Sequence, residues 1–340
     1  MTASGDRDGR RAAARAAGAR GLACALLVVI ALATAGERGV ARAEHVVTRD
    51  WMRSLYVVSD LATHPPATPV VLLLGGSAGR ESTFSDRSWA EQIVRRGGPR
   101  AVVRNLSSKN QTFTQDLTLV TQLPRRTPTL VVIGVNVGRF NMPPTITFPT
   151  WAGPYARVDQ HRYSKSRLLS PERKARIAAE WMTRRYPVFA ERFGYNLAVL
   201  EQVVFACLRR GFRPVLLDLP RNTAVIGEQL DVPIATYSRA CQGLAAHYDI
   251  PFVSFVTRAG FESGDFFDIA HLVEPGRAKW QALLSDTSIA LMNRYGMTIA
   301  DGASPAASGE LHDWCVSPRT SLPVFAPQPT RATTLAETGG

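Results

Sequence analysis

Metal-binding residue types are few and scattered in this chain. The 340 residues include only four cysteines and six histidines. There is no C-x-x-C pair and no cluster of histidines with cysteines, so the spacing of a structural zinc site is absent. We therefore expect neither a metal nor a cofactor.

Lysine is also scarce, and nearly all of the 40 basic residues are arginine. The formal net charge of the chain is +12. The basic residues are dispersed among acidic ones, and no basic run with interleaved aromatic residues occurs, which argues against nucleic-acid binding. A solvated basic surface explains this charge. Association with anionic polymers or lipids of a cell envelope is the alternative.

Long hydrophobic runs are missing apart from one near the start of the chain. The uncharged run from Gly21 to Gly36 follows an arginine-rich segment and is shorter than the about 20 residues of a spanning helix. Ala41 and Ala43 are small residues at the positions that a signal peptidase requires. We interpret residues 1–43 as a signal peptide of a secreted or cell-envelope protein, with an uncleaved membrane anchor as the alternative.

The cysteines do not define a disulfide framework. Cys24 lies in the predicted signal peptide, and Cys207 falls on the apolar stripe of a helical segment, where we expect it to pack as a small hydrophobic residue. Cys241 and Cys315 could pair in an exported chain, but the sequence does not establish this connectivity.

Five short apolar runs recur along the chain and predict buried parallel strands, because they are continuously apolar rather than alternating. The runs cover residues 70–75, 101–106, 129–135, 214–220 and 251–256. Helical patterns lie between and after them, at residues 88–96, 115–123, 171–210, 234–248 and 275–293. Strands that alternate with helices predict an α/β fold, a parallel sheet covered by helices on both faces.

The remaining segments are irregular. Residues 138–170 form a long insertion rich in proline, aromatic residues and arginine, which is typical of a functional loop or lid, although a surface decoration is the alternative. After Ala300 the chain is poor in apolar residues, so we predict a disordered tail over 301–340 and a single domain over 44–300.

Polar residues follow four of these segments at the same edge of the predicted sheet. Ser77 follows the first strand, Asn110 the second and Asn136 the third, and Asp268 and His271 lie beyond the fifth. Ligands of parallel sheets bind at the carboxyl ends of the strands, so we expect these residues to share one site.

These residue types suit acyl transfer. An imidazole activates a serine hydroxyl, and a carboxylate orients the imidazole, which assigns Ser77 as nucleophile, His271 as base and Asp268 as its partner. The N–H of Ser77 and the amides of Asn136 and Asn110 could stabilise the oxyanion.

Other interpretations of the string GGSAG around Ser77 are weaker. It matches the G-x-S-x-G turn of α/β-hydrolases, but in that fold several strands precede the nucleophile, and here about one apolar run does. The string lacks the Gly-Lys-Ser/Thr ending of a phosphate-binding loop. An ordinary turn remains the simplest alternative.

The whole pattern, from about residue 69 to 295, resembles the SGNH (GDSL-like) hydrolase family. LLLGGS matches the family's first block, with Gly76 where aspartate is commonest, and NLSSKNQT places Asn110 where the second block supplies an oxyanion glycine. Gly134-Val135-Asn136-Val137 keeps the asparagine of the third block, and Asp268-Ile269-Ala270-His271 matches the fifth block in full. The resemblance implies a three-layer α/β/α fold with a five-stranded parallel sheet in flavodoxin-like order.

The resemblance further implies an exported hydrolase that cleaves O-acetyl or lipid esters through an acyl-enzyme. The substrates would be acylated small molecules, lipids or glycans. Two alternatives remain: an O-acyltransferase acting on an envelope polysaccharide, and a non-catalytic binding protein on a degenerate scaffold. We expect substrate contacts from residues near the site, namely Arg80, Arg139, Trp151, Tyr155 and His161. For Arg80 and Arg139 the equal alternative is a salt bridge at the surface.

Overall fold

A five-stranded parallel sheet forms the centre of the protein. The computed structural model describes residues 50–125, 127–144 and 164–297. The strand order is β2-β1-β3-β4-β5, and every neighbouring pair is parallel. The strands are β1 (Val70–Leu74), β2 (Val102–Asn105), β3 (Thr129–Val135), β4 (Arg213–Asp218) and β5 (Phe252–Ser254). The predicted flavodoxin-like sheet is therefore confirmed.

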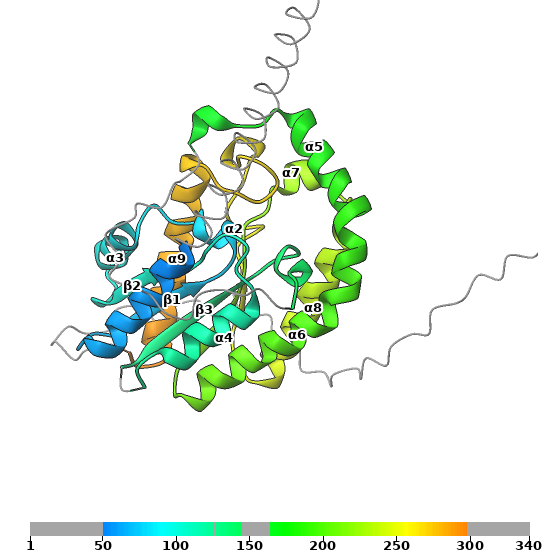
Figure 1. Ribbon diagram of the computed structural model, residues 1–340. Coiled ribbons are helices and arrows are strands. Elements are labelled where there is room, and N and C mark those ends of the chain that lie inside the picture. Colours follow the sequence, from blue (N-terminus) through cyan, green and yellow to red (C-terminus); the bar gives the residue numbers. More distant parts are fainter. Residues whose placement is uncertain (1–49, 126, 145–163, 298–340) are drawn as a thin grey trace, which may run out of the picture.

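Helices cover both faces of this sheet (Figure 1). They are α2 (Ser77–Arg80), α3 (Asp86–Arg95), α4 (Phe113–Gln122), α5 (Pro171–Glu180), α6 (Tyr186–Arg209), α7 (Thr223–Ile226), α8 (Asp231–His247) and α9 (Glu274–Arg294). A further helical segment, residues 50–63, was not expected from the sequence. Short helical turns are η1 (Arg139–Asn141), η2 (Lys165–Arg167), η3 (Trp181–Arg185) and η4 (Ser263–Asp265).

The two faces of the sheet build two hydrophobic cores, which explains why the strands are continuously apolar. In β1, Val70 and Leu72 pack into one core with the segment 50–63 and helices α4, α6 and α8. Val71 and Leu73 point the other way and pack with α3 and α9. Alternate side chains of β1 thus lie in different cores, so this strand is apolar throughout. The three-layer α/β/α architecture follows from this arrangement.

The predicted long helix over 171–210 is interrupted by the π-helical turn η3. Pro187 lies in the first turn of α6, directly after η3. A proline has no N–H to donate to the carbonyl of residue 183, and its ring clashes with that carbonyl, so the backbone widens there. The three pieces still form one curved helical stretch along one side of the sheet (Figure 1).

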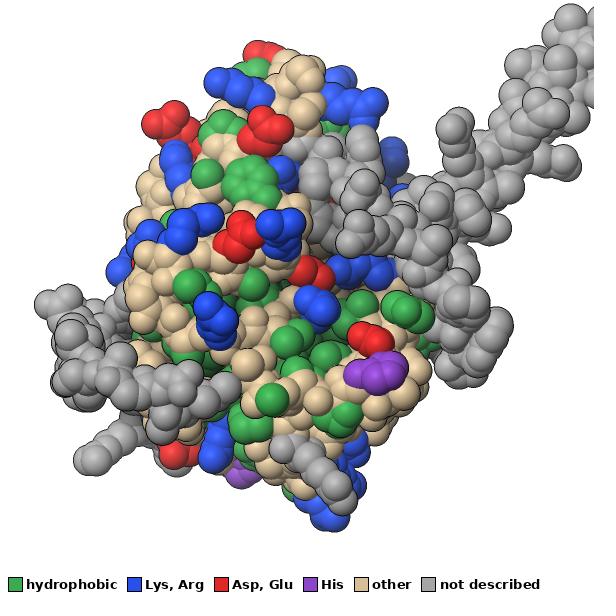
Figure 2. All heavy atoms as spheres, turned by 90° about the vertical axis from the view of Figure 1, so that its left-hand side faces the viewer, with side chains coloured by type: hydrophobic (Ala, Val, Ile, Leu, Met, Phe, Trp, Pro, Cys, Tyr) green, Lys and Arg blue, Asp and Glu red, His purple; other side chains and the backbone are tan. Residues whose placement is uncertain are grey.

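The surface mixes charges of both signs. On the face shown in Figure 2, basic side chains lie among acidic ones and scattered apolar ones. In the part of the chain that the structure describes, helices with the length and apolar character of a membrane span are absent. The predicted signal peptide over 1–43 and the predicted tail over 301–340 lie outside the described residues.

The buried cysteines pack as hydrophobic residues. Cys207 is completely buried in the core of the α6 face, as predicted. Cys241 is also fully buried and is a free thiol, so the disulfide with Cys315 that the sequence left open is not formed by Cys241 here. Cys315 itself lies outside the described residues. Burial raises the pKa of both thiols, which keeps them protonated and unreactive.

Candidate active site

Ser77 lies where β1 turns into the short helix α2. The strand ends at Leu74, two glycines follow, and the helix begins at Ser77 itself. The turn passes close to the loop after β2, because a Cβ on Gly79 would lie 2.8 Å from the hydroxyl oxygen of Ser107. A larger residue at position 79 would push the Ser107 side chain aside, so glycine suits this close approach, and the packed turn holds the Ser77 side chain at the carboxyl edge of the sheet.

Asp268 and His271 lie on a short loop between η4 and α9. The Asp268 carboxylate accepts hydrogen bonds from the backbone N–H groups of Ala270 and His271, both at 2.9 Å. The loop packs tightly on the first turn of α9, where a Cβ on Gly276 would come within 2.4 Å of the Asp265 carbonyl oxygen. The backbone thus fixes the carboxylate before any contact with the imidazole.

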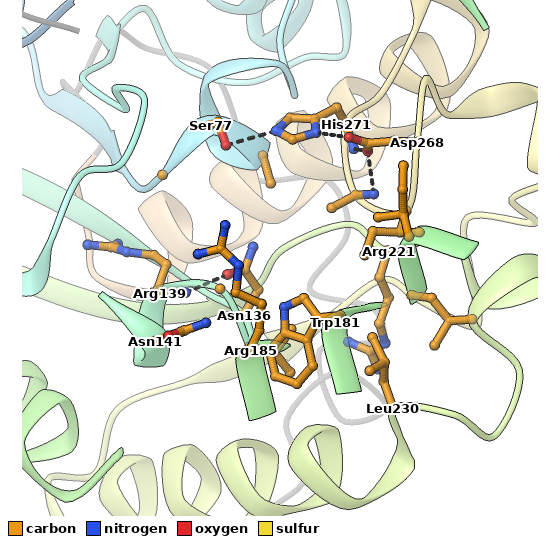
Figure 3. A pocket seen from close by; sticks show the side chains of 18 of the residues that line it. Ser77, Asn136, Arg139, Asn141, Trp181, Arg185, Arg221, Leu230, Asp268 and His271 are labelled. Carbon is orange, nitrogen blue, oxygen red and sulfur yellow. Dashed lines mark hydrogen bonds and ion pairs between the residues drawn. The ribbon is translucent and has the colours of Figure 1, made fainter. Parts of the chain in front are cut away.

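The three side chains form a continuous series of hydrogen bonds (Figure 3). Nδ1 of His271 lies 2.7 Å from Oδ2 of Asp268, and Nε2 lies 2.8 Å from Oγ of Ser77. Since the carboxylate can only accept, the proton of the neutral imidazole lies on Nδ1, and Nε2 is free to accept the serine proton. The side chains of His271 and Asp268 are 21% and 16% exposed, so the series opens toward solvent at one side.

The ionised form of Asp268 is stabilised by its partners. Burial alone would raise the pKa of this carboxyl. The hydrogen bond and charge of His271, together with the two backbone N–H groups, outweigh burial and lower the pKa below its usual value. Asp268 is therefore a carboxylate at neutral pH.

Asn136 presents an amide N–H₂ group near Ser77. Its Oδ1 accepts a hydrogen bond from the backbone N–H of Arg139 at 3.0 Å, at the start of η1 (Figure 3). This contact fixes which end of the amide is the acceptor, so Nδ2 remains as a donor of this pocket-lining residue. The structure thus brings Asn136 to the expected place.

Asn110 also lines the pocket, on the loop after β2. Its backbone has φ of 58°, in the left-handed region where glycine is most favourable and asparagine is better tolerated than most residues. This conformation explains why an asparagine can stand at the position of a glycine.

The two arginines expected to contact substrate are held by buried carboxylates. Arg80 is buried and ion-pairs with Asp50 and Glu81, each at 2.7 Å, and it does not line the pocket, so the prediction of a substrate contact was wrong for Arg80. Arg139 does line the pocket, but its guanidinium is bound to Asp116 at 2.7 Å, with side chains 2% and 0% exposed. Arg139 is a structural cation of the pocket floor.

The other predicted substrate contacts, Trp151, Tyr155 and His161, lie outside the described residues. The structure instead adds a wall that the sequence did not predict. A cavity of about 430 Å³ extends from Ser77 to the helical stretch α5–η3 and to helices α7 and α8. This wall includes Trp181, Arg184, Arg185, Ile226 and Leu230. The sequence feature that points to this wall is Pro187, because a proline inside a long helical pattern predicts an interruption of the helix.

Metal ligands do not gather in the described residues: no group of three or more His, Cys, Asp or Glu side chains is placed to hold an ion. The chemistry of the pocket residues is that of a hydrogen-bonded nucleophile, a base and neutral amide donors.

Comparison with known proteins gives structural likenesses only. No protein-family model matches the sequence, and a search of curated proteins gives no match. A GDSL-like lipase from Bacteroides thetaiotaomicron is 12% identical, with a TM-score of 0.37 over 70% of this chain and 97% of the other. TesA is 16% identical, with a TM-score of 0.36 over 64% and 97% of the two chains. The esterase AlinE4, in a mutant form, is 16% identical, with a TM-score of 0.33 over 71% and 99%.

Proposed function

We propose that this protein is a serine ester hydrolase of the SGNH (GDSL-like) family. The observation that carries the proposal is the hydrogen-bonded series Ser77–His271–Asp268, with contacts of 2.8 and 2.7 Å, at the carboxyl edge of a five-stranded parallel sheet. These side chains come from opposite ends of the domain, so their alignment is not a by-product of local backbone structure.

The proposed reaction has two balanced halves. Oγ of Ser77 attacks the ester carbonyl carbon while His271 accepts the hydroxyl proton, and the imidazolium then gives that proton to the departing alkoxide. Water attacks the resulting acyl-enzyme, His271 takes a proton from the water, and Oγ leaves and recovers a proton. The products are an alcohol and a carboxylic acid. Asp268 holds the imidazole and stabilises its charged form in both halves.

The oxyanion would be stabilised by donors that are fixed in advance. The Ser77 N–H belongs to the first turn of α2, where N–H groups have no acceptor within the helix. Nδ2 of Asn136 is oriented by its contact with the Arg139 backbone. Asn110 contributes either its backbone N–H or its side-chain amide. Donors held in this way stabilise the transition state without reorganising.

The pocket supports an acyl ester as substrate, because apolar residues line the part of the cavity away from the triad. They include Ile226 of α7, Leu230 directly before α8, Ile234 of α8 and Trp181 of η3. An O-acyl group of a lipid or glycan has the size and polarity for such a wall.

Labelling with a fluorophosphonate tests the proposal, because only an activated serine reacts with this probe. We expect the native protein to be labelled at Ser77 and to hydrolyse a 4-nitrophenyl ester. Ser77→Ala and His271→Ala should lose both properties with an unchanged melting temperature, and Ser166→Ala, which changes an exposed serine, should keep both. A Ser77→Ala variant with native activity would refute the mechanism. Labelling with transfer to a sugar hydroxyl but no hydrolysis would indicate an acyltransferase.

We further propose that the protein is exported and that its mature form begins at Glu44. The support is the uncharged run over 21–36 and the small residues Ala41 and Ala43. N-terminal sequencing of the native protein checks this. A protein that retains residues 1–43 would instead be membrane-anchored.

A further inference from the structure

Among the residues that the structure describes, four arginines line the pocket, and two of them are already neutralised by buried acids. Arg139 is bound to Asp116 at 2.7 Å. Arg221 is bound to Asp218 at 2.7 Å, and Tyr237 and Ser254 also donate to this carboxylate. These two cations have partners within the protein and need none from a substrate.

The other two arginines, Arg184 and Arg185, are different. Both belong to the π-helical turn η3 and are exposed. Within the described residues neither forms an ion pair with a carboxylate. Glu180 lies on the same wall one turn earlier but is not paired with Arg184, and Asp268 is bound to His271. The charge that this wall offers to a ligand is therefore positive on balance.

The surroundings of these arginines limit what the ligand can be. Trp181 precedes them on the same turn, and Leu230 lies on the neighbouring wall of the cavity (Figure 3). A ligand that matches this space has an apolar chain and an anionic end. An apolar ligand without the charge would leave the two arginines without a partner, and an anion without the chain would leave Trp181 and Leu230 uncovered. A free phosphate or acetate ion lacks the apolar part.

The position of Arg185 indicates which half of an ester it would meet. Arg185 and Asn136 both line the cavity, and Figure 3 draws both of them below the Ser77–His271 pair. His271 must lie next to the leaving alcohol, since it donates the proton to that oxygen. The wall beside Asn136 therefore receives the acyl half of the substrate.

We propose that the pocket selects esters whose acyl chain ends in a carboxylate, such as half-esters of short dicarboxylic acids, and that Arg184 and Arg185 bind this carboxylate. The inference rests on the proposed ester hydrolysis and specifies its substrate class. Arginine pairs with carboxylates through parallel hydrogen bonds that are shorter and stronger than neutral ones. The methylene groups of the acyl chain pack against Trp181 and Leu230.

The test compares release of 4-nitrophenol from two esters with the same acyl chain, one with a free carboxylate at its end and one with that carboxylate methylated: mono-4-nitrophenyl glutarate and its neutral methyl ester. The wild-type protein should have the higher kcat/KM on the anionic ester. The double variant Arg184→Gln/Arg185→Gln should lose about 10- to 100-fold in kcat/KM on the anionic ester, because hydrogen bonds to charged groups contribute about 1.5–3 kcal/mol. Its kcat/KM on the neutral ester should stay within about twofold of the wild-type value.

The matched control is Arg176→Gln, which removes an exposed charge from the same helical stretch but outside the pocket lining. It should change neither ester, and all variants should melt at the wild-type temperature. Equal losses of the double variant on both esters would overturn the inference. The inference would also be overturned if the protein preferred an anionic group on the alcohol side of the ester, measured with 4-carboxyphenyl butyrate, and not on the acyl side. A wild-type protein that cleaves none of these esters would refute the proposed hydrolysis itself, and the inference with it.

Discussion

Nζ of Lys174, in α5, donates a hydrogen bond to the carbonyl oxygen of Phe266 at 2.9 Å, two residues before Asp268. The ammonium also donates to the carbonyl oxygen of Ser263 at 2.7 Å and to its hydroxyl at 3.3 Å. The side chain is almost completely buried. Burial lowers the pKa of Lys174, and the charge of Asp268 opposes this shift. A buried cation of α5 thus fastens the loop that carries the acid of the triad.

Lys174→Met should loosen that loop and lower kcat on a small neutral ester by about 10-fold or more, since small misplacements of reacting groups are costly. KM should change little, because Lys174 does not line the pocket. Lys174→Arg, which keeps a charged donor, should restore part of kcat. If Lys174→Met lowers only the melting temperature and leaves kcat unchanged, the lysine is a purely structural residue.

The ion pair of Arg139 and Asp116 predicts a stability effect rather than a substrate effect. Arg139→Met leaves a buried carboxylate without its cation and should lower the free energy of unfolding by about 3–5 kcal/mol. Arg139→Met/Asp116→Leu, which removes both charges, should recover most of this loss. Urea unfolding of the variants measures both values. A stable Arg139→Met variant with a raised KM for anionic esters alone would instead indicate that Arg139 binds substrate.

Substitutions of Asn110 can show which of its two groups, the backbone N–H or the side-chain amide, stabilises the oxyanion. Asn110→Gly keeps the backbone N–H and suits the positive φ, so activity should remain within about twofold if the backbone is the donor. Asn110→Ala keeps a Cβ in the left-handed region but removes the short polar side chain that makes asparagine tolerable there, and it should cost about 1 kcal/mol of stability. A large loss of kcat in Asn110→Gly, with native stability, would assign the role to the side-chain amide.

The lowered pKa of Asp268 predicts how stability depends on pH. The stabilisation from its ionised form is fully present above the unfolded-state pKa of about 3.9 and is lost as the pH falls through the lower folded-state value. The difference in free energy of unfolding between the wild type and Asp268→Asn should therefore reach its full value above about pH 5 and shrink as the pH falls from about 4 to about 2. Urea titrations at several pH values measure it, and a difference that stays constant over this range would contradict the assignment.

The sheet and the three aligned side chains could be predicted from sequence for related reasons. Strands buried on both faces must be continuously apolar, and this pattern located all five of them. Parallel strands share one carboxyl edge, so the position of Ser77 after the first strand and of Asp268 and His271 after the fifth predicted their meeting. The catalytic roles themselves remain predictions for the experiments above.

The arginines and the pocket wall could not be predicted in the same way. The role of Arg80 depends on Asp50, which belongs to a helical segment that the sequence pattern did not reveal. The role of Arg139 depends on Asp116 in α4, and nothing in the spacing of the two residues indicates their contact. The widened turn before Pro187 decides which side of the long helix faces the site. A π-helical turn holds one extra residue, which changes the directions of the side chains that follow it.

The two walls of the cavity differ in how they can change over evolution. Ser77, Asn136 and His271 are attached to the ends of a sheet whose side chains lie in two packed cores, so almost any rearrangement there disturbs the whole domain. Arg184 and Arg185 stand exposed on a helical turn outside those cores. Replacing them should alter the choice of substrate at little cost to folding, so descendants of this protein can acquire new specificities while they inherit the same reaction.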